Sequence, residues 1–370
     1  MLNKHDIYSY IASAEYYPLK FNELITELNI PHSDVAVLSQ ILDSLEFEGK
    51  IVKGKKGKYA LPEALDLIAG KFVSSRGGNG FFIPDNKSED IFIPQSDTNG
   101  ALHTDLVLAR IEKPASGSYR AEGKIKSIVS RGYSSIVGLL VADGHKHYVK
   151  PDDSRLQIKL YIPSKSLHGA IAGDKVVATI THYPKDNLTA KGEVSEILGI
   201  QGDAGVDILS VIKSFNLPTE FPEEVIEQAN SIDAQVQPYE IEGRLDLRSQ
   251  TIITIDGEDA RDLDDAINVE KVNGGYKLGV HIADVTHYVI ENTPLDKDAF
   301  NRGTSVYFPD RVVPMLPPSL SNGICSLNQG VNRLTLSVLM DIDENGIVTD
   351  YEIKKSVICS SERMTYTNVT

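Results

Sequence analysis

The sequence predicts a multidomain protein of mixed class, in which an N-terminal α+β domain is followed by two small β-barrels and a second α+β domain. Three observations support this prediction: a helical pattern that runs into a short hairpin, an internal repeat, and an aspartate cluster between two apolar strands. A chain of 370 residues also exceeds one ordinary hydrophobic core, so several domains are expected.

The composition is that of a folded globular protein, with 41% hydrophobic residues. The net charge of −15 argues against a simple nucleic-acid binder, because such proteins usually present a basic face to phosphates. A nucleic-acid-binding function therefore requires a local basic surface, or basic sequence outside this chain.

The chain has two cysteines, Cys325 and Cys359, and no CxxC motif, so neither a zinc site nor a disulfide framework is expected. Residues 1–13 are polar and lack the apolar core of a signal peptide. The longest apolar run, residues 136–142, is too short to span a bilayer. These features predict a cytoplasmic protein with no membrane segment.

Residues 1–65 are expected to form a winged helix, an α+β domain of three helices and a hairpin. Helices are predicted at residues 5–14 and 21–28, and Ser33 is the expected N-cap of a third helix. A hairpin follows at residues 50–61. Apolar positions of the third helix recur at helical spacing, at Val35, Leu38, Leu42 and Leu45.

This hairpin is the most basic stretch of the chain, with Lys50, Lys53, Lys55, Lys56 and Lys58. A basic wing can contact phosphates. A solvated hairpin in a domain that binds other proteins is an equally good interpretation.

An internal repeat determines the middle of the predicted architecture. The segment that begins at Ile91 matches the segment that begins at Leu160, at a constant offset of 69 residues. Short alternating strands and glycine-rich turns favour two small OB-fold, cold-shock-like β-barrels at residues 70–130 and 131–200. The matched pairs include Pro94 with Pro163, Gly100 with Gly169, and Asp105 with Asp174.

Aromatic residues in both repeats are candidates for RNA binding, because unpaired bases stack on aromatic rings. In the first repeat they are Phe81, Phe82 and Phe92, although alternate strand positions point inward and at least one of the adjacent pair is expected in the core. The second repeat keeps Tyr161 opposite Phe92. Where the first repeat has Phe81 and Phe82, the second has Leu139 and Leu140, so its stacking surface is expected to be the weaker one.

Residues 201–240 are predicted to form a helical linker, and the aspartate cluster follows in the last domain, residues 241–370. Residues 254–266 read T-I-D-G-E-D-A-R-D-L-D-D-A. Carboxylates packed this closely repel one another unless a cation offsets their charge, and Mg²⁺ is the usual hard divalent ion inside cells. Acidic runs are usually solvated loops, but apolar strands at 251–255 and 267–272 flank this one and favour a site.

Two further patterns are given no function. His281 and His287 lie in an apolar, strand-like run, where structural histidines are common. Residues 341–352 match the spacing of an EF-hand calcium loop, but the flanking segments alternate like strands. Asn345-Gly346 therefore predicts a β-hairpin turn.

The stretch from Gly243 to Ala266 resembles the opening of the catalytic domain of the ribonuclease II/RNB family of 3′→5′ exoribonucleases. The resemblance continues through VHIADVTHYV from Val280, RGTSVYFP from Arg302, and CSLN from Cys325. The order of domains agrees, and the winged helix favours the ribonuclease R branch. The last domain is then the start of an α+β RNB catalytic domain, and the chain is expected to be an N-terminal fragment that ends inside it.

The resemblance implies catalytic and Mg²⁺-binding roles for Asp256, Asp262, Asp264 and Asp265, and leaves Asp259 without one. Tyr307 resembles the aromatic residue that stacks on RNA, and Tyr366 resembles the tyrosine near the terminal nucleotide. Core packing is the alternative for both tyrosines.

The implied function is Mg²⁺-dependent, processive 3′→5′ hydrolysis of single-stranded RNA to nucleoside 5′-monophosphates, in RNA turnover and quality control. A monomer that binds single-stranded RNA is expected, and the ribosome or the RNA-decay machinery are further candidate partners. The alternative function is that of an RNA-binding or regulatory protein without nuclease activity, which would have no need of the aspartate cluster.

Overall fold

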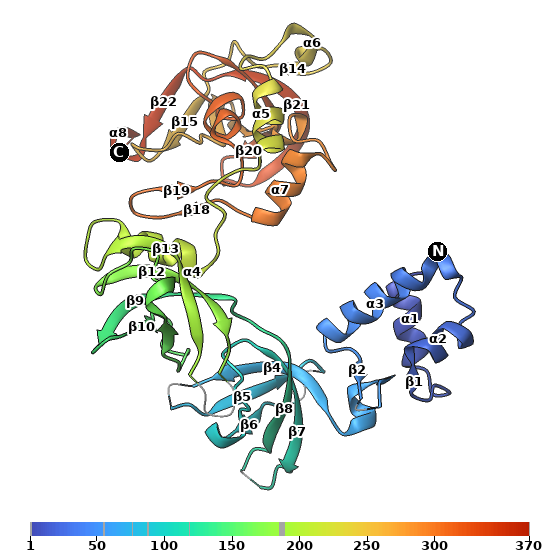
Figure 1. Cartoon of the computed structure of the whole chain (residues 1–370). Coiled ribbons are helices and arrows are strands. Elements are labelled where there is room, and N and C mark those ends of the chain that lie inside the picture. The colour runs from blue at the N-terminus through green and yellow to red at the C-terminus, as the bar shows by residue number, and fades with distance from the viewer. Residues whose placement is uncertain are drawn as a thin grey trace. The chain divides into compact units, whose positions relative to one another are not determined.

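The structure is a computed structural model that describes residues 2–54, 56–75, 77–86, 89–117, 119–184 and 189–369. The chain divides into two compact units, Met1–Phe215 and Asn216–Thr370 (Figure 1). Of the lysines predicted in the basic hairpin, Lys55 lies outside the described residues. Among the described residues, no helix is long and apolar enough to cross a membrane.

The first unit begins with three helices and a small antiparallel sheet of order β1-β3-β2. Leu24, Leu38 and Leu42 are fully buried in its core, as expected for the apolar face of the third helix. The elements are α1 (Lys4–Ile11), β1 (Leu19–Lys20), α2 (Phe21–Glu27), η1 (His32–Asp34), α3 (Val35–Phe47), β2 (Val52–Lys53) and β3 (Lys58–Ala60).

The predicted cap of the third helix is wrong. A single 3₁₀ turn, η1, follows Pro31, and α3 begins one residue after it with Asp34 as N-cap. The Ser33 hydroxyl donates to the Asp34 carboxylate at 2.9 Å instead of capping the helix. Because Pro31 fixes an extended backbone before the turn, the helix starts one residue later than the capping pattern indicates.

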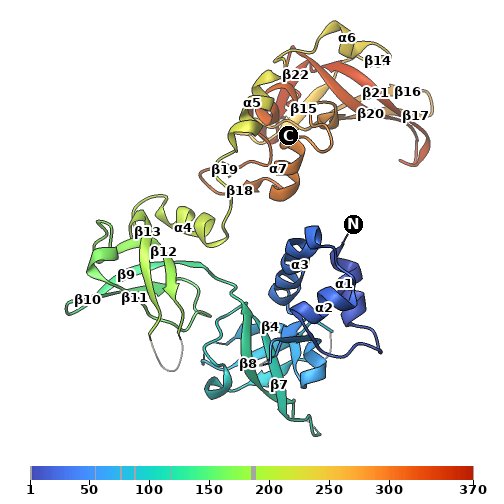
Figure 2. The same ribbon diagram turned by 45° about the vertical axis from the view of Figure 1, so that its right-hand side comes forward.

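Two closed five-stranded barrels follow, and both have the same strand order (Figures 1 and 2). The first is β4-β5-β6-β8-β7, with β4 (Ile68–Ser74), β5 (Gly80–Pro84), β6 (Ile91–Ile93), β7 (Leu106–Lys113) and β8 (Glu122–Ser130). The second has the matching order β9-β10-β11-β13-β12. Its strands are β9 (Ser135–Asp143), β10 (Lys146–Pro151), β11 (Leu160–Ile162), β12 (Asp174–His182) and β13 (Lys191–Ile200). The internal repeat is therefore a duplicated barrel, as predicted.

One pair of repeated residues explains why the two copies share a shape. Asp105 and Asp174 each accept a hydrogen bond from the backbone N–H three residues earlier, of Leu102 and Ile171, at 2.8 Å. Both carboxylates are buried at the start of a long strand. A buried carboxylate that satisfies a turn N–H fixes the turn, so the repeat preserves a structural bond at this point.

The helices of the expected linker, residues 201–240, belong to different units of the chain. α4 (Val206–Ser214) packs on the second barrel through Val206, which joins Val137 and Leu198 in one apolar cluster. α5 (Glu223–Ser231) belongs to the second unit and packs against α7 (Pro294–Arg302). The physical reason is that each helix buries its apolar face against a different neighbouring core.

The second unit is built on a seven-stranded sheet of order β14-β21-β20-β17-β16-β15-β22. Its strands are β14 (Leu245–Asp246), β15 (Ile253–Asp256), β16 (Asp265–Val272), β17 (Gly275–Ala283), β20 (Asn332–Asp343), β21 (Val348–Cys359) and β22 (Glu362–Thr365). The remaining elements are α6 (Pro238–Ile241), the hairpin β18 (Val306–Tyr307) and β19 (Val312–Val313), the π-helical turn Leu320–Ile324, and α8 (Tyr366–Val369).

The EF-hand-like segment is a hairpin turn between β20 and β21, as predicted. The Asp343 carboxylate accepts from the backbone N–H groups of Asn345 and Ile347, each at 2.9 Å. This carboxylate therefore holds the turn, and strands rather than helices flank it.

His281 is a structural histidine, as predicted. Its ring is buried in the sheet, with Nδ1 2.6 Å from the Ser337 hydroxyl and Nε2 2.9 Å from the Asn268 side-chain oxygen. Burial lowers the pKa of His281 to about 4, so the imidazole is neutral near pH 7. His287 faces Glu240, with 2.8 Å between Nε2 and the carboxylate.

The buried and exposed members of the pair Phe81 and Phe82 provide a matched test of the first barrel. Phe82→Ala should lower the free energy of unfolding by about 3–5 kcal/mol, because Phe82 has no exposed surface. Phe81→Ala should cost far less, because its ring lines a surface pocket. Chemical denaturation of both variants measures the difference, and equal losses would contradict this inside–outside assignment.

Candidate active site and RNA-binding surfaces

The aspartate loop, residues 257–264, connects two strands at one edge of the sheet in the second unit. β15 ends at Asp256 and β16 begins at Asp265, so strand ends carry the first and last of the four predicted aspartates. Asp262 and Asp264 lie in the loop between them. The loop joins the edge of the sheet where β22 runs parallel to β15 and pairs Thr365 with Asp256.

The four carboxylates act on one another electrostatically. Burial raises the pKa of Asp256, and the charges of Asp265 and Asp262 raise it further, whereas Arg363 lowers it. Burial also raises the pKa of Asp264, and the other three aspartates add to this shift. Asp259, which was given no role, does not contribute to either shift.

The donor set suits a hard divalent cation. One oxygen of the Asp256 carboxylate is buried and lacks a hydrogen-bond partner among the described residues. An unpartnered carboxylate oxygen beside three other carboxylates offers the all-oxygen coordination that Mg²⁺ prefers. Within the described part of the chain, no three acidic, histidine or cysteine side chains are grouped closely enough to hold a metal ion as they stand.

Tyr307 lies at this site, on the hairpin of β18 and β19. Its hydroxyl donates a hydrogen bond to the Asp262 carboxylate, which raises the pKa of Tyr307 to about 12. The side chain is nevertheless 62% exposed. The ring is therefore available for stacking while the hydroxyl orients one of the four aspartates, so core packing does not explain this residue.

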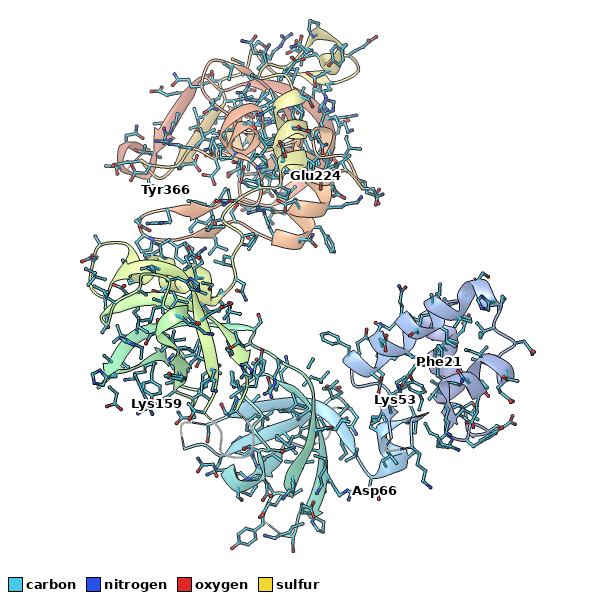
Figure 3. All side chains as sticks on the ribbon, in the orientation of Figure 1. Phe21, Lys53, Asp66, Lys159, Glu224 and Tyr366 are labelled. Carbon is cyan, nitrogen blue, oxygen red and sulfur yellow. The ribbon has the colours of Figure 1, made fainter. Side chains whose placement is uncertain are left out.

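Tyr366 is also on the surface, as Figure 3 shows, with 67% of its area exposed. It follows Thr365, the strand partner of Asp256, so the backbone places it next to the aspartate site. The structure therefore brings Tyr307, Tyr366 and the four aspartates to one part of the second unit.

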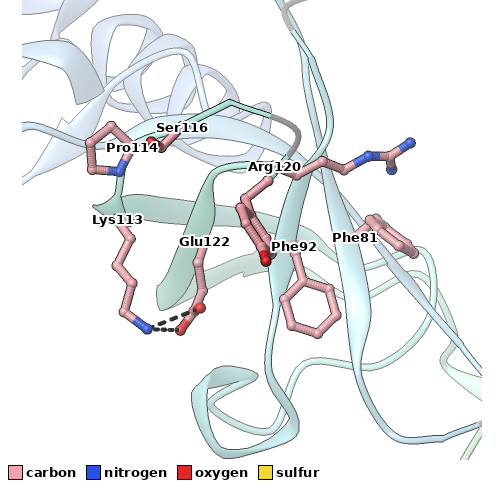
Figure 4. A pocket seen from close by; sticks show the side chains of 8 residues that line it. Phe81, Phe92, Lys113, Pro114, Ser116, Arg120 and Glu122 are labelled. Carbon is pink, nitrogen blue, oxygen red and sulfur yellow. Dashed lines mark hydrogen bonds and ion pairs between the residues drawn. The ribbon is translucent and has the colours of Figure 1, made fainter.

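The first barrel carries an aromatic pocket of about 540 Å³ (Figure 4). The rings of Phe81 and Phe92 lie 5.9 Å apart in an edge-to-face contact, and the Arg120 guanidinium lies 5.4 Å from the Phe81 ring centre. Tyr119 on the adjoining loop is almost fully exposed. Exposed rings beside a cation suit the stacking of nucleobases and the neutralisation of phosphates.

Phe82 must be removed from the set of candidate stacking residues. Its side chain has no exposed surface and lies in the core of the first barrel with Phe72. Successive residues of a strand face opposite sides, so Phe81 faces outward and Phe82 inward.

The second barrel has an aromatic pair that the sequence analysis missed. The rings of Tyr148 and Tyr161 lie 5.7 Å apart, and the two residues are strand partners just as Phe81 and Phe92 are. The sequence comparison matched Phe81 to Leu139, which lies on β9, whereas the strand equivalent to β5 is β10, which carries Tyr148. The second barrel therefore has a ring at this position, and a weaker second stacking surface stays a prediction.

In each barrel the aromatic pair belongs to a row of paired residues that continues across neighbouring strands. In the first barrel the row runs Phe81, Phe92, Glu122, Lys113, and Lys113 forms an ion pair with Glu122 at 3.0 Å. In the second barrel it runs Tyr148, Tyr161, Lys191, His182. The rings are thus similar in the two barrels, whereas the charges beside them differ.

Comparison with known proteins agrees with this layout. Three family models match the chain: the ribonuclease B OB domain over residues 70–128, the cold shock domain over 148–222, and the RNB domain over 244–370. The fold and the aspartate loop therefore define an RNB-type protein with OB-fold barrels ahead of its RNB domain.

Curated relatives make the assignment narrower. Ribonuclease R of Thermotoga maritima is 42% identical over the whole chain and 52% of its own length. Ribonuclease R of Escherichia coli is 38% identical to this chain, and the match covers 95% of this chain and 43% of the relative. Ribonuclease R of Acidithiobacillus ferrooxidans is 36% identical, and the match covers 95% of this chain and 80% of the relative. The chain belongs to the ribonuclease R family, and it spans about half the length of the first two relatives.

Solved structures extend the comparison. Mycoplasma genitalium RNase R in complex with ribose methylated single-stranded RNA matches with a TM-score of 0.76 and 27% identity, over 82% of this chain and 48% of that one. Yeast Ssd1, a pseudonuclease, matches with a TM-score of 0.60 and 20% identity, over 82% of this chain and 45% of Ssd1. The second likeness shows the fold alone.

The repulsion within the aspartate site can be tested through stability. Asp264→Asn removes one of four like charges while preserving shape, so it should raise the unfolding midpoint in EDTA. The same variant should lose stabilisation by added Mg²⁺. Asp259→Asn, in the same loop, is the matched control and should change neither value. Thermal unfolding with EDTA and with Mg²⁺ measures both, and identical behaviour of the two variants would argue against a shared carboxylate site.

Proposed function

We propose that the protein is a Mg²⁺-dependent 3′→5′ exoribonuclease that hydrolyses single-stranded RNA processively to nucleoside 5′-monophosphates, in RNA turnover and quality control. The observation that carries the proposal is the group of four carboxylates at one edge of a sheet that matches the RNB family. The related RNase R of Mycoplasma genitalium, solved in complex with ribose methylated single-stranded RNA, supports the substrate class.

Asp256, Asp262, Asp264 and Asp265 would hold the cation through their carboxylate oxygens. When bound, Mg²⁺ lowers the pKa of a bound water and neutralises charge on the phosphoryl oxygens of the RNA. Tyr307 keeps Asp262 oriented through its hydroxyl and offers its ring to a base. Tyr366 would contact the terminal nucleotide from the adjoining strand end.

The barrels would bind the RNA strand before it reaches the aspartates. Phe81 and Phe92 on one barrel, and Tyr148 and Tyr161 on the other, supply paired ring faces. Stacking on such rings tolerates any base, which suits an enzyme that must bind every sequence it degrades. The cations beside these rings would supply the local positive charge that RNA binding requires in a chain with a net charge of −15.

The N-terminal helices and basic hairpin would form a winged helix over residues 1–65, in which Lys53 and Lys58 are available to phosphates or to a partner protein. The barrels would occupy residues 70–130 and 131–200, and the RNB domain would begin near residue 241. The protein would act as a cytoplasmic monomer, with the ribosome or the RNA-decay machinery as candidate partners.

Activity of the full-length protein tests the proposal. Asp264→Asn should lower the rate of shortening of a 5′-labelled single-stranded RNA by about 10²–10³-fold, and leave RNA affinity within a factor of two or so. EDTA should reproduce the loss, and Asp259→Asn should retain activity. A wild-type protein that binds RNA but never shortens it would instead support the RNA-binding alternative, which the fold alone does not exclude, since a pseudonuclease shares it.

Binding measurements test the second barrel. Tyr148→Ala should weaken the affinity for single-stranded RNA by about 1–3 kcal/mol, the usual contribution of one stacked base. Tyr148→Phe should be nearly neutral, because the ring carries the contact. Fluorescence anisotropy with a labelled oligonucleotide measures both, and Leu139→Ala is the comparison at the position that the sequence comparison matched to Phe81. If Tyr148→Ala binds RNA like the wild type, this ring pair is not a platform.

A further inference from the structure

The aspartate loop has little regular structure of its own, although two of the four predicted metal ligands lie in it. Its backbone contributes a turn bond from the Ala260 N–H to the Gly257 carbonyl at 3.2 Å. A loop of this length has many alternative conformations unless other residues restrain it. The residues that hold it therefore decide where Asp262 and Asp264 lie.

Arg363 holds the first half of the loop. It lies on β22, where parallel pairing sets it beside Thr254 of β15, two residues before Asp256. Its Nη2 donates to the carbonyl oxygens of Ala260 at 2.7 Å, Glu258 at 2.8 Å and Gly257 at 3.3 Å. One guanidinium nitrogen thus binds three carbonyl groups of the same four-residue stretch of the loop.

Arg363 also lies on the face of the sheet that carries Asp256. It pairs with Thr254, and strand residues two positions apart point to the same side. Arg363 Nε is buried without a hydrogen-bond partner among the described residues, as is one oxygen of Asp256. The strand pairing thus places a guanidinium on the same face as this carboxylate.

Ser326 holds the second half of the loop. Its hydroxyl donates to the Arg261 carbonyl at 2.8 Å and accepts from the Leu263 N–H at 3.1 Å. These two bonds flank Asp262 in the sequence. Ser326 is fully buried, and Arg333 fixes it in turn by donating to its carbonyl at 2.7 Å.

We propose that Arg363 and Ser326 are positioning residues that hold the aspartate loop from its two sides before any cation binds. Arg363 fixes residues 257–260 and supplies a resident positive charge beside Asp256, whereas Ser326 fixes the backbone on both sides of Asp262. The inference rests on the proposed function for its catalytic consequence, but the restraint of the loop is a property of the fold.

The two effects of Arg363 are separable by substitution in the full-length protein. Arg363→Lys keeps the charge, but a single ammonium on a flexible stem cannot reproduce the fixed fork. Arg363→Met removes both, and Ser326→Ala removes the second clamp. Arg248→Lys is the matched control, because Arg248 lies on the surface of the same unit and pairs with Asp246.

Hydrogen exchange of residues 257–264 is the direct readout, and we expect it to be at least about tenfold faster in Arg363→Lys, Arg363→Met and Ser326→Ala than in the control. The Mg²⁺ concentration that gives half-maximal thermal stabilisation should rise in Ser326→Ala and Arg363→Lys, because both variants keep the charges of the site and lose a restraint on the loop that positions its ligands. With RNA, kcat should fall by up to about 10²-fold at nearly constant KM, because misplacement of catalytic groups affects turnover more than binding.

Wild-type exchange in the loop of Arg363→Met and of Ser326→Ala would overturn the proposal. A uniform rise of exchange across the unit would overturn it too, since it would indicate general destabilisation. If the wild type itself does not degrade RNA, the proposed function fails, whereas loop exchange and Mg²⁺ stabilisation still decide the role of the two residues.

Discussion

Repulsion among four carboxylates is the constraint on which the second unit depends. Each of Asp256 and Asp264 is partly removed from water and lies in the field of the other aspartates, which disfavours the ionised forms. A fold that keeps such a group together must supply rigidity from elsewhere. Here the sheet supplies it at Asp256 and Asp265, and side chains from distant segments supply it in the loop between them.

Those distant segments explain why short motifs spread over the second unit belong together. Arg363 reaches back across more than a hundred residues to the loop, and Ser326 does so across more than sixty. Tyr307 adds a bond to Asp262 from a hairpin that contributes nothing to the main sheet. The site is thus assembled from four parts of the chain, and each contributes a hydrogen bond that no local sequence pattern predicts.

The sequence was sufficient for features governed by short-range chemistry. Alternating strands, the Asn345-Gly346 turn, the duplicated barrel and the aspartates between two strands all followed from local patterns or from the repeat. Features that depend on contacts between distant parts of the chain were harder to predict. Phe82 differs from Phe81 only in the side of the strand that it faces. Tyr148 was missed because Phe81 was matched to Leu139 on the preceding strand, and Ser33 does not cap the third helix because Pro31 sets a turn before it. Arg363 had no local signal at all, because its partners are backbone carbonyls.

The duplicated barrels show what happens to a surface once the core beneath it is fixed. The inward-facing residues remain apolar in both copies, whereas the outward row ends in a neutralised ion pair in one copy and in Lys191 and His182 in the other. Ions in solution compete with a protein for phosphates only where the protein offers unpaired positive charge. Both barrels nevertheless keep a cation close to their rings, Arg120 in the first and Lys191 in the second, so added salt would weaken the attraction of either barrel for a polyanion.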